Sequence, residues 1–102
     1  MSLDITMHSH PLFNQNSHRY VQIEVSRFAH DGFNPNSIGD SLIFILDQIN
    51  HAPNEYRYHL ASSIRQWLID NINVYYGHSA QFLIDQLDVT LCQYQFNLSH
   101  SN

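Results

Sequence analysis

Lysine is absent from this sequence, and its only fixed cations are four arginines, against nine carboxylates. The formal net charge is −5 with histidine neutral. Without lysine, a Walker A phosphate site, Schiff-base chemistry and the strand lysine of protein kinases are excluded. Nucleic-acid binding takes most of its affinity from Lys and Arg contacts with phosphates, and four scattered arginines cannot form the usual basic face. We therefore expect no direct nucleic-acid partner.

Cysteine and glycine are also scarce. Cys92 is the only cysteine, so an intramolecular disulfide, and with it a disulfide-stapled secreted fold, is excluded. Cys92 shares the apolar phase of an alternating segment, which predicts a buried structural thiol rather than a nucleophile. The three glycines, Gly32, Gly39 and Gly77, lie too far apart for a phosphate-binding loop.

Long apolar runs are missing as well. The longest covers residues 42–46, whereas a membrane span needs roughly 20 residues. The first ten residues contain no basic region followed by an apolar stretch, so they do not resemble a secretion signal. These features predict a cytoplasmic protein without a membrane partner.

The residues that are present favour one small packed domain. The chain has 102 residues, of which 43% are hydrophobic and 13% aromatic, enough for a single core. Charged residues make up only 13%, against about 25% in an average soluble protein. We predict a single domain over residues 1–102, with residues 1–17 loosely ordered around Pro11.

Three helices are predicted between residues 37 and 88. Ser37 resembles an N-cap, and apolar residues at helical spacing continue to about Asn50. A second helix ends near Gly77, which we expect to adopt a left-handed cap conformation. Ser79 can cap the third helix. The predicted inner faces comprise Ile38, Leu42, Ile45 and Ile49, widened by Leu46, then Leu60, Ile64, Trp67, Leu68 and Ile72, then Phe82, Leu83 and Leu87.

Alternating apolar and polar residues predict strands at both ends of the chain. The alternation is weak at 3–8 and clearer at 19–28 and 90–98, where β-favouring residues contribute. A helix is the competing interpretation of 19–28, because Val21, Val25 and Phe28 also recur at helical spacing. The predicted fold class is therefore α+β, a small antiparallel sheet from the N- and C-terminal strands with about three helices on one face. An all-α bundle is the alternative.

Histidine is the one abundant metal-ligating residue, with eight copies. On a strand, His8 and His10 project to the same face, and Asp4 or His18 can supply a third ligand, which gives a candidate zinc or nickel site. The other interpretation is that these are solvated polar side chains. Because imidazole titrates near neutral pH, a pH-responsive regulatory module is a further hypothesis.

Catalytic patterns are weak. His59 lies near Ser62 and Ser63, but no nucleophile-elbow motif accompanies them, and Asp85 with Asp88 fits a turn better than an acid–base pair. We therefore expect a protein that is not an enzyme and needs no cofactor.

A protein-binding surface is the remaining prediction. Tyr and Arg are enriched at binding hot spots, and carboxylates steer encounters with basic partners. The favoured function is a small acidic inhibitor of another protein, of the immunity-protein, antitoxin or phage-inhibitor type, which blocks a basic or nucleic-acid-binding site. A homodimer or oligomer subunit is an alternative. The candidate contact residues are Asp47, Tyr56, Arg57, Tyr58, Asp70, Tyr75, Tyr76 and Asp85.

Overall fold

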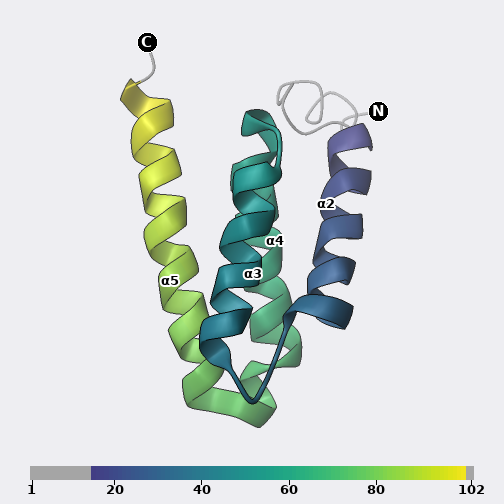
Figure 1. Ribbon diagram of the computed structural model, residues 1–102. Helices are drawn as coiled ribbons and strands as arrows, with labels where there is room; N and C mark the ends of the chain where they lie inside the picture. The colour runs from purple at the N-terminus through teal and green to yellow at the C-terminus, as the bar shows by residue number, and fades with distance from the viewer. Residues whose placement is uncertain (1–14, 101–102) are drawn as a thin grey trace.

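Helices make up every regular element of the computed structural model, which describes residues 15–100 (Figure 1). Side chains are described for 15–73 and 76–94. Four α-helices and one π-helical turn follow each other along the chain. They are α2 (Gln15–Arg27), η1 (Phe28–Gly32), α3 (Ile38–His51), α4 (Asn54–Asn71) and α5 (Asn73–His100).

The helices alternate in direction, so that α2 and α4 run one way and α3 and α5 the other (Figure 1). Helix α4 contacts both α5 and α2, and α3 contacts η1, α4 and α5. The hydrophobic core lies between them. Its buried apolar residues are Val21, Phe28, Ile45, Ile49, Ala52, Leu60, Ala61, Ile64, Leu68, Ile72, Ala80, Leu83, Ile84 and Leu87.

The predicted α+β class is wrong, and the all-α alternative describes the fold. Residues 19–28 belong to α2 and η1 because the core selects helical spacing: Val21 and Phe28 are 3% and 0% exposed, whereas Ile23 is 58% exposed. A strand would have placed Val21 and Ile23 on one face. The strand predicted at 3–8 lies outside the described residues.

The C-terminal strand predicted at 90–98 is also wrong. These residues continue α5. Leu91 and Tyr94 pack against the core three residues apart and extend the face of Leu87, while Cys92 is exposed. The buried thiol predicted for Cys92 is therefore wrong too, since it depended on the strand.

The central helices follow the sequence prediction closely. Ser37 is the N-cap of α3, and its hydroxyl accepts a hydrogen bond from the backbone N–H of Asp40 at 3.3 Å. The predicted inner face of α4 is buried except at Trp67, which is partly exposed. On α5, Leu83 and Leu87 are buried as expected, whereas Phe82 is 45% exposed and does not belong to the inner face.

The junction between α4 and α5 differs from the predicted glycine cap. Helix α4 ends at Asn71, and a non-helical break within α5 falls at Tyr76 and Gly77. Gly77 has φ of 15° and ψ of −87°, which is not the left-handed conformation. Helical hydrogen bonds continue through Ile72, whose backbone N–H donates to Leu68 O at 3.0 Å and whose carbonyl accepts from the N–H of Tyr76 at 2.9 Å.

An aromatic cluster forms where η1 meets α3 and α4. The N–H of Phe33 donates to the carbonyl of Phe28 at 2.8 Å, five residues back, which closes the π-helical turn. The buried ring of Phe28 contacts the rings of Phe33, Phe44 and Trp67. Gly32 permits this packing, because a Cβ there would overlap the rings of Phe44 and Phe28.

A buried amide connects α2 to α3. Gln48 is 1% exposed, and its Nε2 donates to Glu24 O at 2.8 Å and to Glu24 Oε1 at 3.1 Å. The carboxylate of Glu24 also accepts from Arg27 at 3.1 Å. Because a buried polar group is costly unless it is bonded, this interaction fixes the position of α2 against α3.

Candidate functional site

The residues predicted to bind a partner are spread over three helices. Asp47 lies on α3. Four of them, Tyr56, Arg57, Tyr58 and Asp70, lie on α4. Tyr76 and Asp85 lie on α5, together with Tyr75, whose side chain is outside the described part. The fold does not gather this set on one surface.

Arg57 has a structural role within the chain. Its Nε donates to Ala52 O at 3.0 Å, and its Nη2 donates to Asn50 O at 2.7 Å. These carbonyls lie at the C-terminal end of α3, where no helical partner remains for them. The neighbouring Tyr94 is partly buried. Burial raises the pKa of its hydroxyl, and the charge of Arg57 acts against that rise.

The tyrosines of α4 and α5 are likewise engaged in internal contacts. The rings of Tyr56 and Tyr20 lie 5.3 Å apart and join α4 to α2. Burial, and to a lesser extent the charge of Glu24, raises the pKa of Tyr20. The ring of Tyr58 contacts His59, and that of Tyr76 contacts Phe33. Only Tyr76 of these keeps a large exposed fraction, 43%.

The proposed metal site is not assembled in the described part of the chain. His8 and His10 lie outside the described residues. His18 is exposed on α2, at one end of a groove. Within the described residues, no group of three or more His, Cys, Asp or Glu side chains is placed to hold a metal ion.

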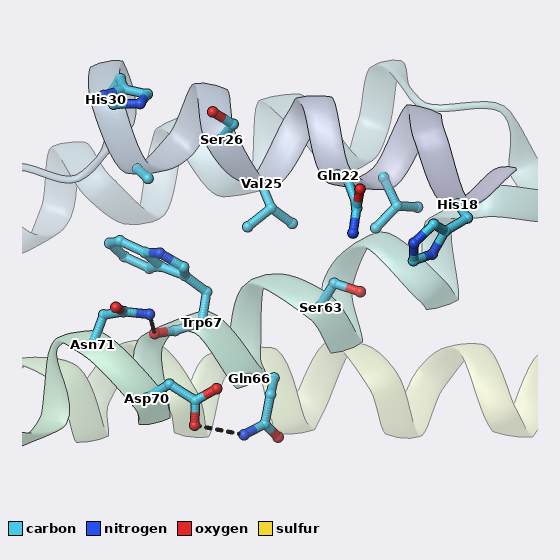
Figure 2. Close-up of a pocket in the computed structure, with 12 residues that line it drawn as sticks. His18, Gln22, Val25, Ser26, His30, Ser63, Gln66, Trp67, Asp70 and Asn71 are labelled. Atoms are coloured by element: carbon cyan, nitrogen blue, oxygen red, sulfur yellow. Dashed lines mark hydrogen bonds between the residues drawn. The ribbon is translucent and has the colours of Figure 1, made fainter. Parts of the chain in front are cut away.

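The groove itself runs between α2 and α4 and has a volume of about 680 Å³. Figure 2 shows Trp67 reaching from α4 toward the chain segment that carries His30, with polar side chains along both walls. Gln66 Nε2 donates to Asp70 Oδ1 at 2.9 Å, so the groove's carboxylate is occupied by a neighbour on its own helix. The lining residues include no arginine. The groove is lined by His18, Val21, Gln22, Val25, Ser26, Ala29, His30, Ser63, Gln66, Trp67, Asp70 and Asn71.

Charge is divided unequally among the helices. All four arginines lie on α2 and α4. They equal in number the four carboxylates of α2, η1 and α4, which are Glu24, Asp31, Glu55 and Asp70. Helices α3 and α5 contain four carboxylates and no arginine, a formal charge of −4 with histidine neutral. These are Asp40, Asp47, Asp85 and Asp88, all exposed.

The same two helices expose large apolar side chains. Ile43 and Leu46 on α3 are 66% and 38% exposed, and Phe82 and Val89 on α5 are 45% and 56% exposed. Most exposed apolar residues on a protein surface occur singly. Here four of them lie on two helices that contact each other.

Helix geometry turns these side chains away from the core, because Ile43 and Val89 lie about 200° round their helices from the buried Ile45 and Leu87. Phe44 contacts Phe28 and Arg27 on the α2 side of α3. Leu46, about 200° further round the helix, therefore lies on the opposite edge, where α5 is the neighbour (Figure 1). On α5, Asp88 pairs with Arg65 of α4 at 2.6 Å.

Val89 and Phe82 lie about 100° and 120° away from Asp88 in the same rotational sense, away from α4. We call the surface formed by Asp40, Ile43, Leu46, Asp47, Phe82, Asp85 and Val89 the α3–α5 face.

No protein-family model, curated protein or solved structure matches this chain. Its candidate site is therefore defined by geometry and charge alone. Among the described residues, no helix is both long and apolar enough to cross a membrane.

Of the contact residues predicted from the sequence, Asp47 and Asp85 lie on the α3–α5 face, whereas its apolar members were not among them. One signal for this face is present in the sequence: no arginine or lysine occurs between residues 28 and 56 or after Arg65.

Proposed function

We propose that this protein is a non-enzymatic binding domain that inhibits another protein by covering a basic surface on it, such as an active-site cleft or a nucleic-acid-binding site. The observation that carries the proposal is the charge division, in which α3 and α5 have a formal charge of −4 and no arginine. Complementary charge accelerates encounter and selects against partners of like charge. A cytoplasmic location is part of this proposal.

The α3–α5 face replaces the dispersed residues of the sequence prediction as the contact surface. Asp47 and Asp85 remain in it. Arg57 and Tyr56 are excluded from the contact surface, because both make contacts between helices within the chain. Asp70 is excluded as well, because it lies on α4, outside the α3–α5 face.

The experiment is capture followed by inhibition. The immobilised protein is exposed to a lysate of the encoding organism at moderate salt. A recovered partner is then purified, and its own activity is measured with increasing amounts of this protein. We expect full inhibition near equimolar ratio and an apparent affinity that falls as salt rises.

A matched pair of variants separates the face from total charge. Asp47→Asn with Asp85→Asn removes two carboxylates from the face, and Glu55→Gln with Asp70→Asn removes two exposed carboxylates from α4. We expect the first variant to inhibit weakly and the second to behave as the wild type. Equal loss in both, or recovery of no partner that is inhibited, contradicts the proposal.

A further inference from the structure

The exposed apolar side chains of the α3–α5 face form two short ridges. Ile43 and Leu46 are three residues apart on α3, and Phe82 and Val89 are seven apart on α5, so the members of each pair share one side of their helix. Two adjacent helices with such ridges present a shallow surface onto which a third helix packs by inserting its own side chains. The shape therefore favours a helical occupant.

The charged side chains around these two ridges indicate which kind of molecule can bind there. Asp40, Asp47 and Asp85 border the apolar side chains, and neither helix has a lysine or arginine to offset them. A nucleic acid or an anionic lipid surface brings more negative charge to the same place. A second copy of the chain would bring the same carboxylates, which disfavours self-association through this face.

We propose that the α3–α5 face binds an amphipathic helix of the partner, with an apolar stripe that covers Ile43, Leu46, Phe82 and Val89 and with lysine or arginine along both edges of the stripe. This inference rests on the proposed function, since it names the element by which the inhibited protein is recognised. Helix-in-groove recognition of this kind is read from anchors at helical spacing, as on these two ridges.

A model peptide tests the chemistry without knowledge of the natural partner. The probe is an amphipathic helix of Leu and Lys, about 18 residues long and so roughly 27 Å in length. Its controls are a peptide of the same composition with the apolar stripe scrambled, and a Leu and Glu peptide with the same stripe. Binding to the full-length protein is measured by titration calorimetry at two salt concentrations. We expect only the Leu and Lys helix to bind, with weaker binding at higher salt.

Variants locate the binding surface. Phe82→Ser with Val89→Ser removes one ridge, and because both side chains are largely exposed the fold should persist, which circular dichroism checks. We expect the affinity for the Leu and Lys helix to fall by about tenfold or more, the usual effect of removing central apolar anchors. Ile23→Ser is the matched control, since Ile23 is 58% exposed on α2, outside the face. It should leave the affinity unchanged.

Three outcomes overturn the inference. Equal binding of the scrambled peptide means that the face recognises positive charge alone and not an apolar stripe. An Ile23→Ser effect as large as that of the double variant means that the site is elsewhere. A wild-type dimer that becomes monomeric in the double variant means that a second copy occupies the face. The inference can also fail while the proposed function holds. This is the case if a captured partner is inhibited equally by the wild type and by the Phe82→Ser, Val89→Ser variant.

Discussion

The helix pair α2 and α4 and the helix pair α3 and α5 differ in how their charged side chains are arranged. On α2 and α4 the arginines are used inside the molecule: Arg57 binds carbonyls at the end of α3, and Arg65 pairs with Asp88. On α3 and α5 there is no arginine, and Asp40, Asp47 and Asp85 face solvent beside apolar side chains. The comparison teaches that three of the nine carboxylates lie on the α3–α5 face, on helices that contain no arginine, so that composition alone underestimates the local negative charge.

The largest expected difference between the pairs concerns two phenylalanines. Phe28 in η1 is fully buried against three aromatic rings, and Phe82 on α5 is 45% exposed. We expect Phe28→Ala to lower the free energy of unfolding by about 3–5 kcal/mol, and Phe82→Ala to change it by less than about 1 kcal/mol. Urea denaturation followed by circular dichroism measures both. A large loss for Phe82→Ala would mean that its side chain is covered in solution.

Two glycines give a second contrast of the same kind. A Cβ at Gly32 would overlap the rings of Phe44 and Phe28, whereas a Cβ at Gly39 meets nothing within 4 Å. We expect Gly32→Ala to destabilise the fold by about 1–3 kcal/mol through overpacking. Gly39→Ala, in the first turn of α3, should be neutral or stabilise by up to about 1 kcal/mol. Thermal melting of both variants decides this, and equal melting temperatures contradict the packing described around η1.

A third contrast separates stability from binding. Arg57→Met removes the bonds to Ala52 O and Asn50 O, and we expect it to lower the free energy of unfolding by about 1 kcal/mol without weakening partner binding. Asp47→Asn should do the reverse, changing stability by less than about 0.5 kcal/mol while weakening binding. Denaturation and a binding titration on the same preparations test both halves. If Arg57→Met weakens partner binding while the free energy of unfolding is unchanged, Arg57 belongs to the contact surface after all.

The smallest expected effect is one in which the two pairs behave alike. Tyr20 on α2 and Tyr94 on α5 both have a pKa raised above the ordinary value of 10.0, chiefly by burial. The folded state therefore holds these protons longer than the unfolded state, so their stabilisation is complete below pH 10 and is lost as the pH rises above it. Tyr20→Phe and Tyr94→Phe should each reduce the alkaline loss of stability. Melting curves from pH 8 upward measure it, and unchanged slopes in both variants contradict the assignment.

Sequence periodicity predicted the centre of the fold and failed at its ends. Helix α3 with its Ser37 cap and the inner face of α4 follow directly from apolar spacing, because these segments are long and strongly periodic. In α2, period 2 and helical spacing coexist, since Val21 and Val25 satisfy both. The β-branched residues favoured a strand, and packing of Phe28 and Val21 into the core decided for a helix.

The candidate site was predicted only in part because residue type does not show where a side chain is used. Tyr56 and Arg57 have the composition of a binding hot spot, but their contacts are with Tyr20 and the end of α3. Phe82 was predicted on the inner face together with Leu83 and Leu87, but its side chain is 45% exposed. Its membership of the α3–α5 face follows from the contact between α3 and α5, which the sequence does not show.

The π-helical turn of η1 accommodates one residue more between Phe28 and Phe33 than an α-helical turn would. Phe28 and Phe33 are five residues apart, and in an α-helix they would point about 140° away from each other. The wider turn lets both rings reach Trp67, with centroids at 5.6 Å and 6.3 Å from it. Deleting one residue between them, such as His30, would leave the two rings four positions apart, a spacing at which an α-helical turn keeps them about 40° apart on one face. Related chains with this fold are therefore expected to tolerate an α-helical turn that is one residue shorter at this place.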